Sequence, residues 1–145
     1  EEMGTTLRTS YRYYRDSWKL RSHTWQAEWV QPFGNRYTLT PLIRYYTQNA
    51  ASFYVDPETN PVSGQPQLPA SLDTANEFTS DQRLSAFGAV TVGLKAAVRL
   101  DHDWSADVKL EYLEQRASWR VGGQGSPGLQ PFKATSLQWG VSKVF

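Results

Sequence analysis

Apolar and polar side chains alternate along most of this 145-residue chain. In the stretch 104–115, for example, Val108, Leu110 and Tyr112 alternate with Lys109 and Glu111. Successive side chains of a β-strand point to opposite faces, so this pattern predicts strands with one apolar and one polar face. Six strands are predicted, over residues 4–15, 20–31, 37–48, 81–100, 104–115 and 133–145. Pro41 falls within the third strand and is expected to interrupt its hydrogen bonding locally.

The connections between these strands differ in length. Tight turns are predicted at 31–36 (QPFGNR) and 101–103 (DHD), and the connection 16–19 is short. The other two connections, 49–80 and the Gly-rich 116–131, are long. Short turns at one end and long loops at the other are typical of an antiparallel up-and-down outer-membrane β-barrel, whose long loops are extracellular. Residues 1–145 are therefore expected to form one domain of that kind.

The apolar face has two possible surroundings. A soluble sandwich or a lipocalin-like binding barrel turns it inward, whereas a membrane barrel turns it outward to lipid. Most of the predicted strands have 11 to 13 residues. Globular strands usually have about 5–6 residues, and a tilted membrane strand needs about 9–11. Strand length therefore favours the membrane barrel.

The positions of the aromatic residues favour the same choice. They gather toward the two ends of the apolar face and leave aliphatic residues between them, as in the aromatic girdles at the two membrane interfaces. Trp25 and Trp139 lie nearer the middle. The predicted girdle residues are Trp29, Tyr37, Trp104 and Phe145 toward the tight turns, and Tyr11, Tyr13, Tyr45 and Tyr112 toward the long loops.

The opposite face carries seven basic and three acidic residues. In a barrel these side chains face the lumen. One interpretation is a salt-bridge network that holds a filled barrel together, and the other is a pore whose wall favours anions. The predicted lumen-facing charges are Arg8, Arg12, Glu28, Arg44, Arg83, Lys95, Arg99, Asp107, Lys109 and Glu111.

Composition and motifs narrow the chemistry. The net charge is +1, so no basic field indicates nucleic acid. The chain has no cysteine and no run of 18 apolar residues, which excludes thiolate chemistry and a transmembrane helix within it. No nucleophile elbow, phosphate loop or two-histidine metal motif is present. His23 is interpreted as a surface residue and His102 as part of a turn. We therefore predict no catalytic residues, no metal and no cofactor, and a protein that is not an enzyme.

Acidic residues in and around the first long loop offer a calcium site as an alternative. Their spacing is irregular, which favours solvated carboxylates instead. The residues concerned are Asp56, Glu58, Asp73, Glu77 and Asp81.

The last strand resembles the terminal strand of bacterial outer-membrane barrels. Leu137, Trp139, Val141 and Phe145 occupy alternate positions, although Lys143 departs from the pattern. Such a strand is recognised by the barrel assembly machinery, so the resemblance implies that partner and a C-terminus in the periplasm.

Longer stretches resemble an uncharacterised domain-of-unknown-function family of Gram-negative outer-membrane β-barrel proteins. The stretches are YRYYRDSW (11–18), LIRYYTQNAASFY (42–54), DQRLSAFGA (81–89) and GGQGSPGL (122–129). The resemblance implies a fold and a location, with this chain as the C-terminal part of a longer protein, and assigns no catalytic residue.

Six strands are too few to close a membrane barrel, because single-chain barrels begin at eight. The chain is therefore expected to pair with further strands of the same barrel or of another envelope protein, in contact with outer-membrane lipid. The expected role is a porin-like conduit or the barrel component of an envelope complex. The alternative is a sheath or scaffold around a periplasmic electron carrier or a surface partner.

Overall fold

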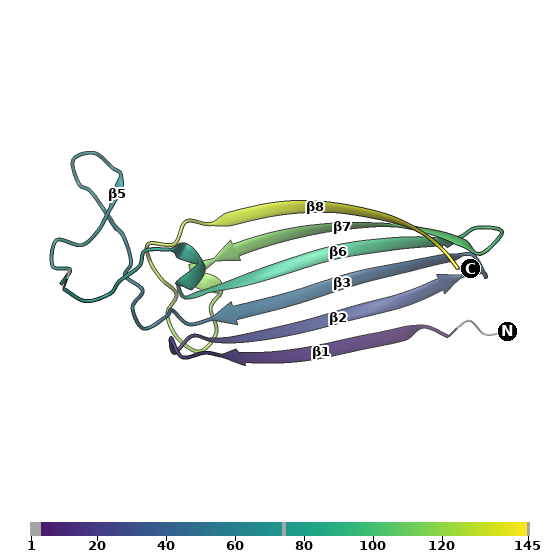
Figure 1. The fold of residues 1–145 in the computed structure, drawn as a ribbon, viewed down its shortest axis with the longest axis horizontal. Helices are drawn as coiled ribbons and strands as arrows, with labels where there is room; N and C mark the ends of the chain where they lie inside the picture. The colour runs from purple at the N-terminus through teal and green to yellow at the C-terminus, as the bar shows by residue number, and fades with distance from the viewer. Residues whose placement is uncertain (1–3, 74, 145) are drawn as a thin grey trace.

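The computed structural model describes residues 4–73 and 75–144, most of which lie in one antiparallel sheet (Figure 1). Its six long strands follow one another as a meander in the order β1-β2-β3-β6-β7-β8. Within the described residues, the outer edges of β1 and β8 pair with no other strand, so the sheet is open. The strands are β1 (Thr6–Arg15), β2 (Arg21–Phe33), β3 (Tyr37–Gln48), β6 (Phe87–Arg99), β7 (Trp104–Arg116) and β8 (Phe132–Lys143).

The prediction of six antiparallel strands is confirmed, with one strand corrected. The predicted strand 81–100 begins only at Phe87, because the residues before it form the 3-10 helix η1 (Gln82–Leu84). The Asp81 carboxylate accepts a 3.0 Å hydrogen bond from the Arg83 backbone N–H and caps this turn. A side chain that bonds its own backbone in this way favours a turn over a strand ladder.

The two tight connections lie at the same end of the sheet, on the right of Figure 1, as predicted. The first is shorter than 31–36, because Phe33 still pairs with Tyr37 and only Gly34 to Arg36 turn. The two turns also hold each other. The Arg99 N–H donates to the Arg36 carbonyl at 2.8 Å, and the Arg36 guanidinium lies 3.1 Å from Asp101.

Pro41 interrupts the sheet on one side only. Between β2 and β3 the pairs Glu28–Leu42 and Gln31–Leu39 share one register, but the two positions between them are unpaired. The pairing of β3 with β6 runs through Pro41 without a break. The predicted local interruption is confirmed, and its cause is that proline has no N–H to donate.

Burial is concentrated at the other end of the sheet, where the long loops lie. Segment 49–86 contains the short hairpin of β4 (Glu58–Thr59) and β5 (Pro66–Gln67), and segment 117–131 contains the 3-10 helix η2 (Ala117–Trp119). Ser85 is fully buried there, and the Gln48 amide donates to the carbonyls of Arg83 and Ser85 at 2.9 and 2.7 Å. The parts of the loops next to the sheet therefore dock on its end, whereas the hairpin that contains β5 extends away from it (Figure 1).

Among residues 4–73 and 75–144, no helix is long and apolar enough to cross a membrane.

Candidate functional site: the polar face of the sheet

Nine of the ten predicted lumen-facing charges share one face of the sheet, which we call the polar face. The register shows this directly, because residues opposite one another in antiparallel strands point the same way. Arg8 lies opposite Glu28, Glu28 opposite Leu42, Leu42 opposite Gly93, and Gly93 opposite Glu111. The other charges on this face occupy neighbouring rows; they are Arg12, Arg44, Lys95, Arg99, Asp107 and Lys109.

Arg83 is the exception and corrects the prediction. It lies in η1, outside the sheet, with a side chain that is 88% exposed. Its guanidinium binds the Asp81 carboxylate at 2.6 Å, which lowers the pKa of Asp81 through the hydrogen bonds that Arg83 donates. The alternation that placed Arg83 on the polar face therefore does not extend to this turn.

A network of polar side chains crosses the middle of the polar face. The Gln26 amide donates to Glu28 at 2.7 Å and accepts from Arg44 Nε at 2.7 Å. Arg44 also lies 3.9 Å from the Glu111 carboxylate, which binds Lys109 at 3.2 Å. Residues of β2, β3 and β7 are thus joined across β6, and their charges partly neutralise one another.

Gly93 makes room for this crossing. It lies on β6 between β3 and β7, where a Cβ atom would lie 2.9 Å from Glu111 Cγ and 3.1 Å from Leu42 Cγ. With no side chain at Gly93, the carboxylate of Glu111 lies over the strand and is only 13% exposed. Glycine in a strand often marks such a close approach.

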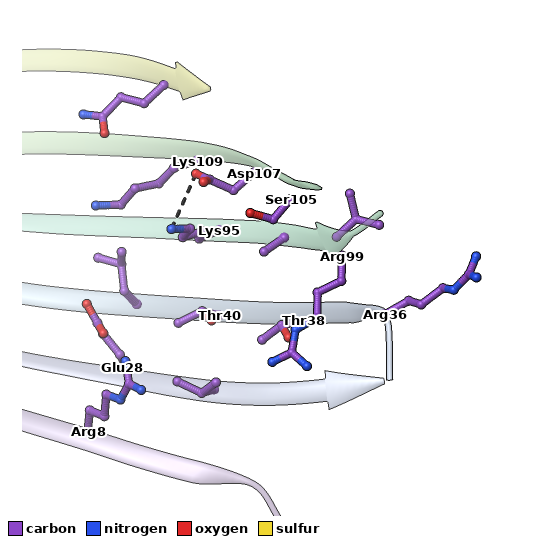
Figure 2. Close-up of a pocket in the computed structure, with 15 residues that line it drawn as sticks. Arg8, Glu28, Arg36, Thr38, Thr40, Lys95, Arg99, Ser105, Asp107 and Lys109 are labelled. Atoms are coloured by element: carbon purple, nitrogen blue, oxygen red, sulfur yellow. Dashed lines mark ion pairs between the residues drawn. The ribbon is translucent and has the colours of Figure 1, made fainter. Parts of the chain in front are cut away.

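A hollow of about 590 Å³ lies on the polar face near the tight turns, and we call it the turn-end hollow. Residues of all six long strands line it, from Arg8 on β1 to Gln138 on β8, so the polar face is concave across the strands. In Figure 2, Arg99 reaches over β3 toward Thr38, Arg8 lies beside Glu28, and Arg36 points away beyond the strand ends.

Acids and bases are unequal in the turn-end hollow. Asp107 is paired with Lys95 at 3.5 Å (Figure 2). Arg8 and Arg99 form no ion pair with any residue that the structure describes. The wall of this hollow therefore carries excess positive charge.

A second hollow, also of about 590 Å³, lies on the same face near the long loops; we call it the loop-end hollow. Phe87, Ala89, Tyr46 and Leu113 form one part of its lining, and arginines form another. Sequence reasoning missed this hollow, because it treated the polar face as uniformly polar. The available signal was an aromatic or aliphatic residue at a polar-face position in each of three strands.

The second long loop closes the loop end of the sheet on both faces. On the polar face, Leu129 packs with Phe87 and Ala89, and Ser126 holds Ala86 by hydrogen bonds of 2.8 Å in both directions. On the apolar face, the Tyr45 hydroxyl donates to the Trp119 carbonyl. Residues that are distant in sequence make these contacts.

A family model described as Protein of unknown function (DUF3570) matches residues 2–135, from before β1 to the first residues of β8. The chain belongs to the DUF3570 family. The search of curated proteins and the search of solved structures each found no match.

The apolar face of this DUF3570 sheet carries all the predicted girdle residues except Phe145. Phe145, which is also the last residue of the predicted assembly signal, lies outside the described residues. Toward the loops, Tyr11, Trp25 and Tyr45 lie level with one another, with ring centroids 5.4 and 5.8 Å apart. His23 stacks on Trp25 and its ring nitrogen lies 2.7 Å from the Tyr11 hydroxyl, so this histidine belongs to an aromatic cluster. Trp25 therefore lies in the loop-side group and not near the middle.

On β7 both aromatic groups lie closer to the turns than they do on β2 or β3, although the loop-side group is level across β1, β2 and β3. In the turn-side group, the register places Trp29 of β2 at the same level as Pro41 of β3 and Leu110 of β7. Trp104, the member of this group on β7, lies six residues closer to the turns than Leu110. In the loop-side group, Tyr45 of β3 is level with Glu114 of β7. Tyr112, the member of this group on β7, lies two residues closer to the turns than Glu114. The two groups are therefore displaced in the same direction on β7. Leu137, Trp139 and Val141 of the predicted assembly signal are exposed on this face, and Lys143 lies 5.4 Å from the Trp104 ring.

No group of three or more potential metal ligands occurs within the part of the chain that the structure describes. Asp56 accepts hydrogen bonds from Tyr54 and from the Gly128 N–H, and Asp73 accepts from Ala75 and Asn76. Asp56, Asp73 and Asp81 are thus each engaged by different neighbours. His102 and Asp103 both have φ of 62° and form the β6–β7 turn.

Proposed function

We propose that this sheet is part of the wall of an outer-membrane β-barrel, with its apolar face against lipid and its polar face toward the lumen. The observation that carries the proposal is the pair of aromatic groups, both displaced toward the turns on β7, with aliphatic residues between them. Strands of a membrane barrel are tilted by about 35–45°, so a flat membrane interface crosses successive strands at shifted positions. Such a tilt displaces both groups in the same sense.

The dimensions of the sheet support the same assignment. β2, β6 and β7 each have 13 residues. At about 3.3 Å per residue these strands are roughly 43 Å long, and at a tilt of about 40° they span roughly 33 Å. That length covers an apolar band of about 25 Å together with its aromatic borders.

The open edges of β1 and β8 define what the barrel still needs. Unpaired backbone groups cost several kcal/mol each in hydrocarbon, so both edges must pair with further strands in the membrane. We infer that these strands come from the same barrel or from another envelope protein. In this arrangement the tight turns face the periplasm and the two long loops lie outside the cell.

The barrel acts as a porin-like conduit that favours anions. The turn-end hollow supports this role because five basic side chains line it against two acidic ones, and Arg8 and Arg99 form no ion pair with any described residue. Fixed positive charge along a confined wall raises the local concentration of anions. A barrel that served only as a filled scaffold would not need uncompensated arginines on this wall.

The test is the reversal potential of the full barrel in planar bilayers under a salt gradient. The proposal predicts stepwise conductance with anion preference, and a clear loss of that preference in Arg8→Gln/Arg99→Gln. Arg83→Gln is the control, since it removes one arginine charge from a side chain outside the sheet. An inserted, folded barrel that does not conduct would contradict the conduit.

A further inference from the structure

The loop-end hollow combines charge and apolar surface in a way that the turn-end hollow does not. Phe87 and Leu113 line it, and the Tyr46 ring lies 5.7 Å from Phe87. Arg12 and Arg44 line it as well. No aromatic side chain lines the turn-end hollow within the described residues. The volume of the loop-end hollow, about 590 Å³, lies within the usual range for small-molecule sites, which are mostly apolar with a few placed polar groups.

The two arginines have donors to spare. A guanidinium carries five N–H donors in a planar fork that matches a carboxylate. Arg44 uses Nε on Gln26 and lies 3.9 Å from Glu111, which leaves most of its donors unengaged by described residues. Arg12 makes no hydrogen bond or ion pair within the described part of the chain. Both can therefore bind an acceptor that enters the hollow.

A third polar group, the Thr24 hydroxyl, also lines this hollow. The Thr24 hydroxyl is buried and forms no hydrogen bond with any residue that the structure describes. It lies directly opposite Arg12 on one side and Tyr46 on the other, and it lines the hollow. Buried hydroxyls are almost always satisfied, so this oxygen is expected to bond a polar atom that is not part of the described chain, either of a water or of a ligand.

We propose that the loop-end hollow binds an amphipathic organic anion, namely a carboxylate on an aromatic or aliphatic body. The carboxylate lies between Arg12 and Arg44 within reach of Thr24, and the apolar body packs on Phe87 and Leu113. The inference rests on the proposed function for the route by which the solute arrives, because the hollow opens on the lumen side of the sheet. It names the class of solute that the conduit selects.

The probe is 4-phenylbutyrate, and its neutral analogue 4-phenylbutyramide is the matched control ligand. Binding is measured by calorimetry on the full barrel in lipid nanodiscs, with empty nanodiscs subtracted. The acid is expected to bind saturably and at least roughly tenfold more tightly than the amide, since charge-assisted bonds to arginine are lost with the amide. Inorganic phosphate, which has no apolar body, is expected to bind more weakly than the acid.

Variants separate binding from folding. Arg12→Gln is expected to weaken acid binding about tenfold and to leave amide binding unchanged, and Arg12→Lys is expected to restore part of the loss. Arg83→Gln, outside the sheet, is expected to change neither. Thr24→Val removes the unsatisfied hydroxyl at nearly constant volume. It is expected to raise the stability of the ligand-free protein while weakening acid binding severalfold, which a purely structural threonine would not do.

The outcomes distinguish this inference from the proposed function. Equal affinity for acid and amide, or no saturable binding by a barrel that conducts, overturns the inference and leaves the conduit standing. Saturable, Arg12-dependent acid binding by an inserted barrel that does not conduct supports the site and contradicts the conduit.

Discussion

The two faces of the sheet are built from alternate residues of the same strands, yet they differ in how their side chains are satisfied. On the polar face, the largely buried Glu111 carboxylate lies within ion-pair distance of both Arg44 and Lys109. On the apolar face, Leu137 and Trp139 are 67% and 79% exposed and pack against little within the described chain. The middle of the polar face is thus joined by side-chain contacts within the sheet, whereas the apolar face leaves large side chains exposed. Under the proposed function, lipid covers these exposed side chains.

The largest effect is expected from placing a charge on the apolar face. Leu137→Arg is predicted to lower the free energy of unfolding from lipid vesicles by about 2–4 kcal/mol, because an arginine facing lipid near the bilayer midplane costs that much. Gln138→Arg, one residue along β8 and on the polar face, is predicted to cost less than about 0.5 kcal/mol. Denaturant titrations of both variants in the same vesicles provide the comparison. Equal costs for the two arginines would mean that the faces are not distinguished by lipid.

The next effect concerns the loop end, where the apolar face is covered. A Cβ at Gly88 would overlap the Trp119 carbonyl, and Val121 N–H bonds Thr47 Oγ1 at 3.1 Å close by. Gly88→Ala is therefore predicted to displace segment 117–121 and to cost about 1–3 kcal/mol, as overpacking does. Protease cleavage in this segment, measured on the intact barrel, is predicted to accelerate. Gly4→Ala meets no atom within 4 Å and is the control; a fully tolerated Gly88→Ala would refute the docked loop.

A smaller effect is expected within the polar network. Glu111→Gln removes the charge that holds Lys109 and Arg44, and is predicted to cost about 1–2 kcal/mol, between the values for exposed and buried ion pairs. Asp101→Asn breaks an ion pair whose side chains are 64% and 74% exposed, and is predicted to cost at most about 0.5 kcal/mol. The free energies of unfolding of the two variants, measured under the same conditions, test this difference. A smaller loss for Glu111→Gln than for Asp101→Asn would show that the network does not stabilise the sheet.

The smallest effect is a pH dependence in the first long loop. Burial, and then the charge of Asp56 with the 3.3 Å hydrogen bond to it, raise the pKa of Tyr54 to about 12. A raised pKa means that the docked loop favours the neutral phenol. This contribution is complete below pH 10, the ordinary tyrosine pKa, and is lost as the pH rises through about 12. The tyrosinate absorbance of the wild type, after subtraction of that of Tyr54→Phe, is predicted to rise in one step near pH 12. A step near pH 10 would contradict the raised pKa of Tyr54.

The sequence predicted the sheet well because the alternation of side chains is a local property. Five strands begin and end within a few residues of the expected positions. Alternation along a strand also predicts on which face of the sheet each charged side chain of that strand lies. The strand expected from residue 81 begins late because the Asp81 carboxylate bonds the backbone of its own turn, which alternation does not reveal. Arg83 was misplaced for the same reason.

The loop end was beyond sequence reasoning for a different physical cause. Leu129 reaches Phe87, and Ser126 reaches Ala86, only because a flexible Gly-rich segment folds back over the sheet. No periodicity encodes such contacts between distant residues. The loop-end hollow was missed because the polar face was treated as uniformly polar, although Tyr46 and Phe87 are aromatic residues at polar-face positions.

The most direct test of the central claim uses lipids with brominated acyl chains, which quench nearby tryptophan. A variant that keeps only Trp139, with the other five tryptophans replaced by phenylalanine, is reconstituted into vesicles of such lipids. Its neighbours on the apolar face, Val108 and Leu137, belong to the aliphatic region, so the account predicts strong quenching of Trp139 by bromines deep in the chains. Unquenched Trp139 fluorescence in a folded, vesicle-bound protein would contradict the assignment of this face to lipid.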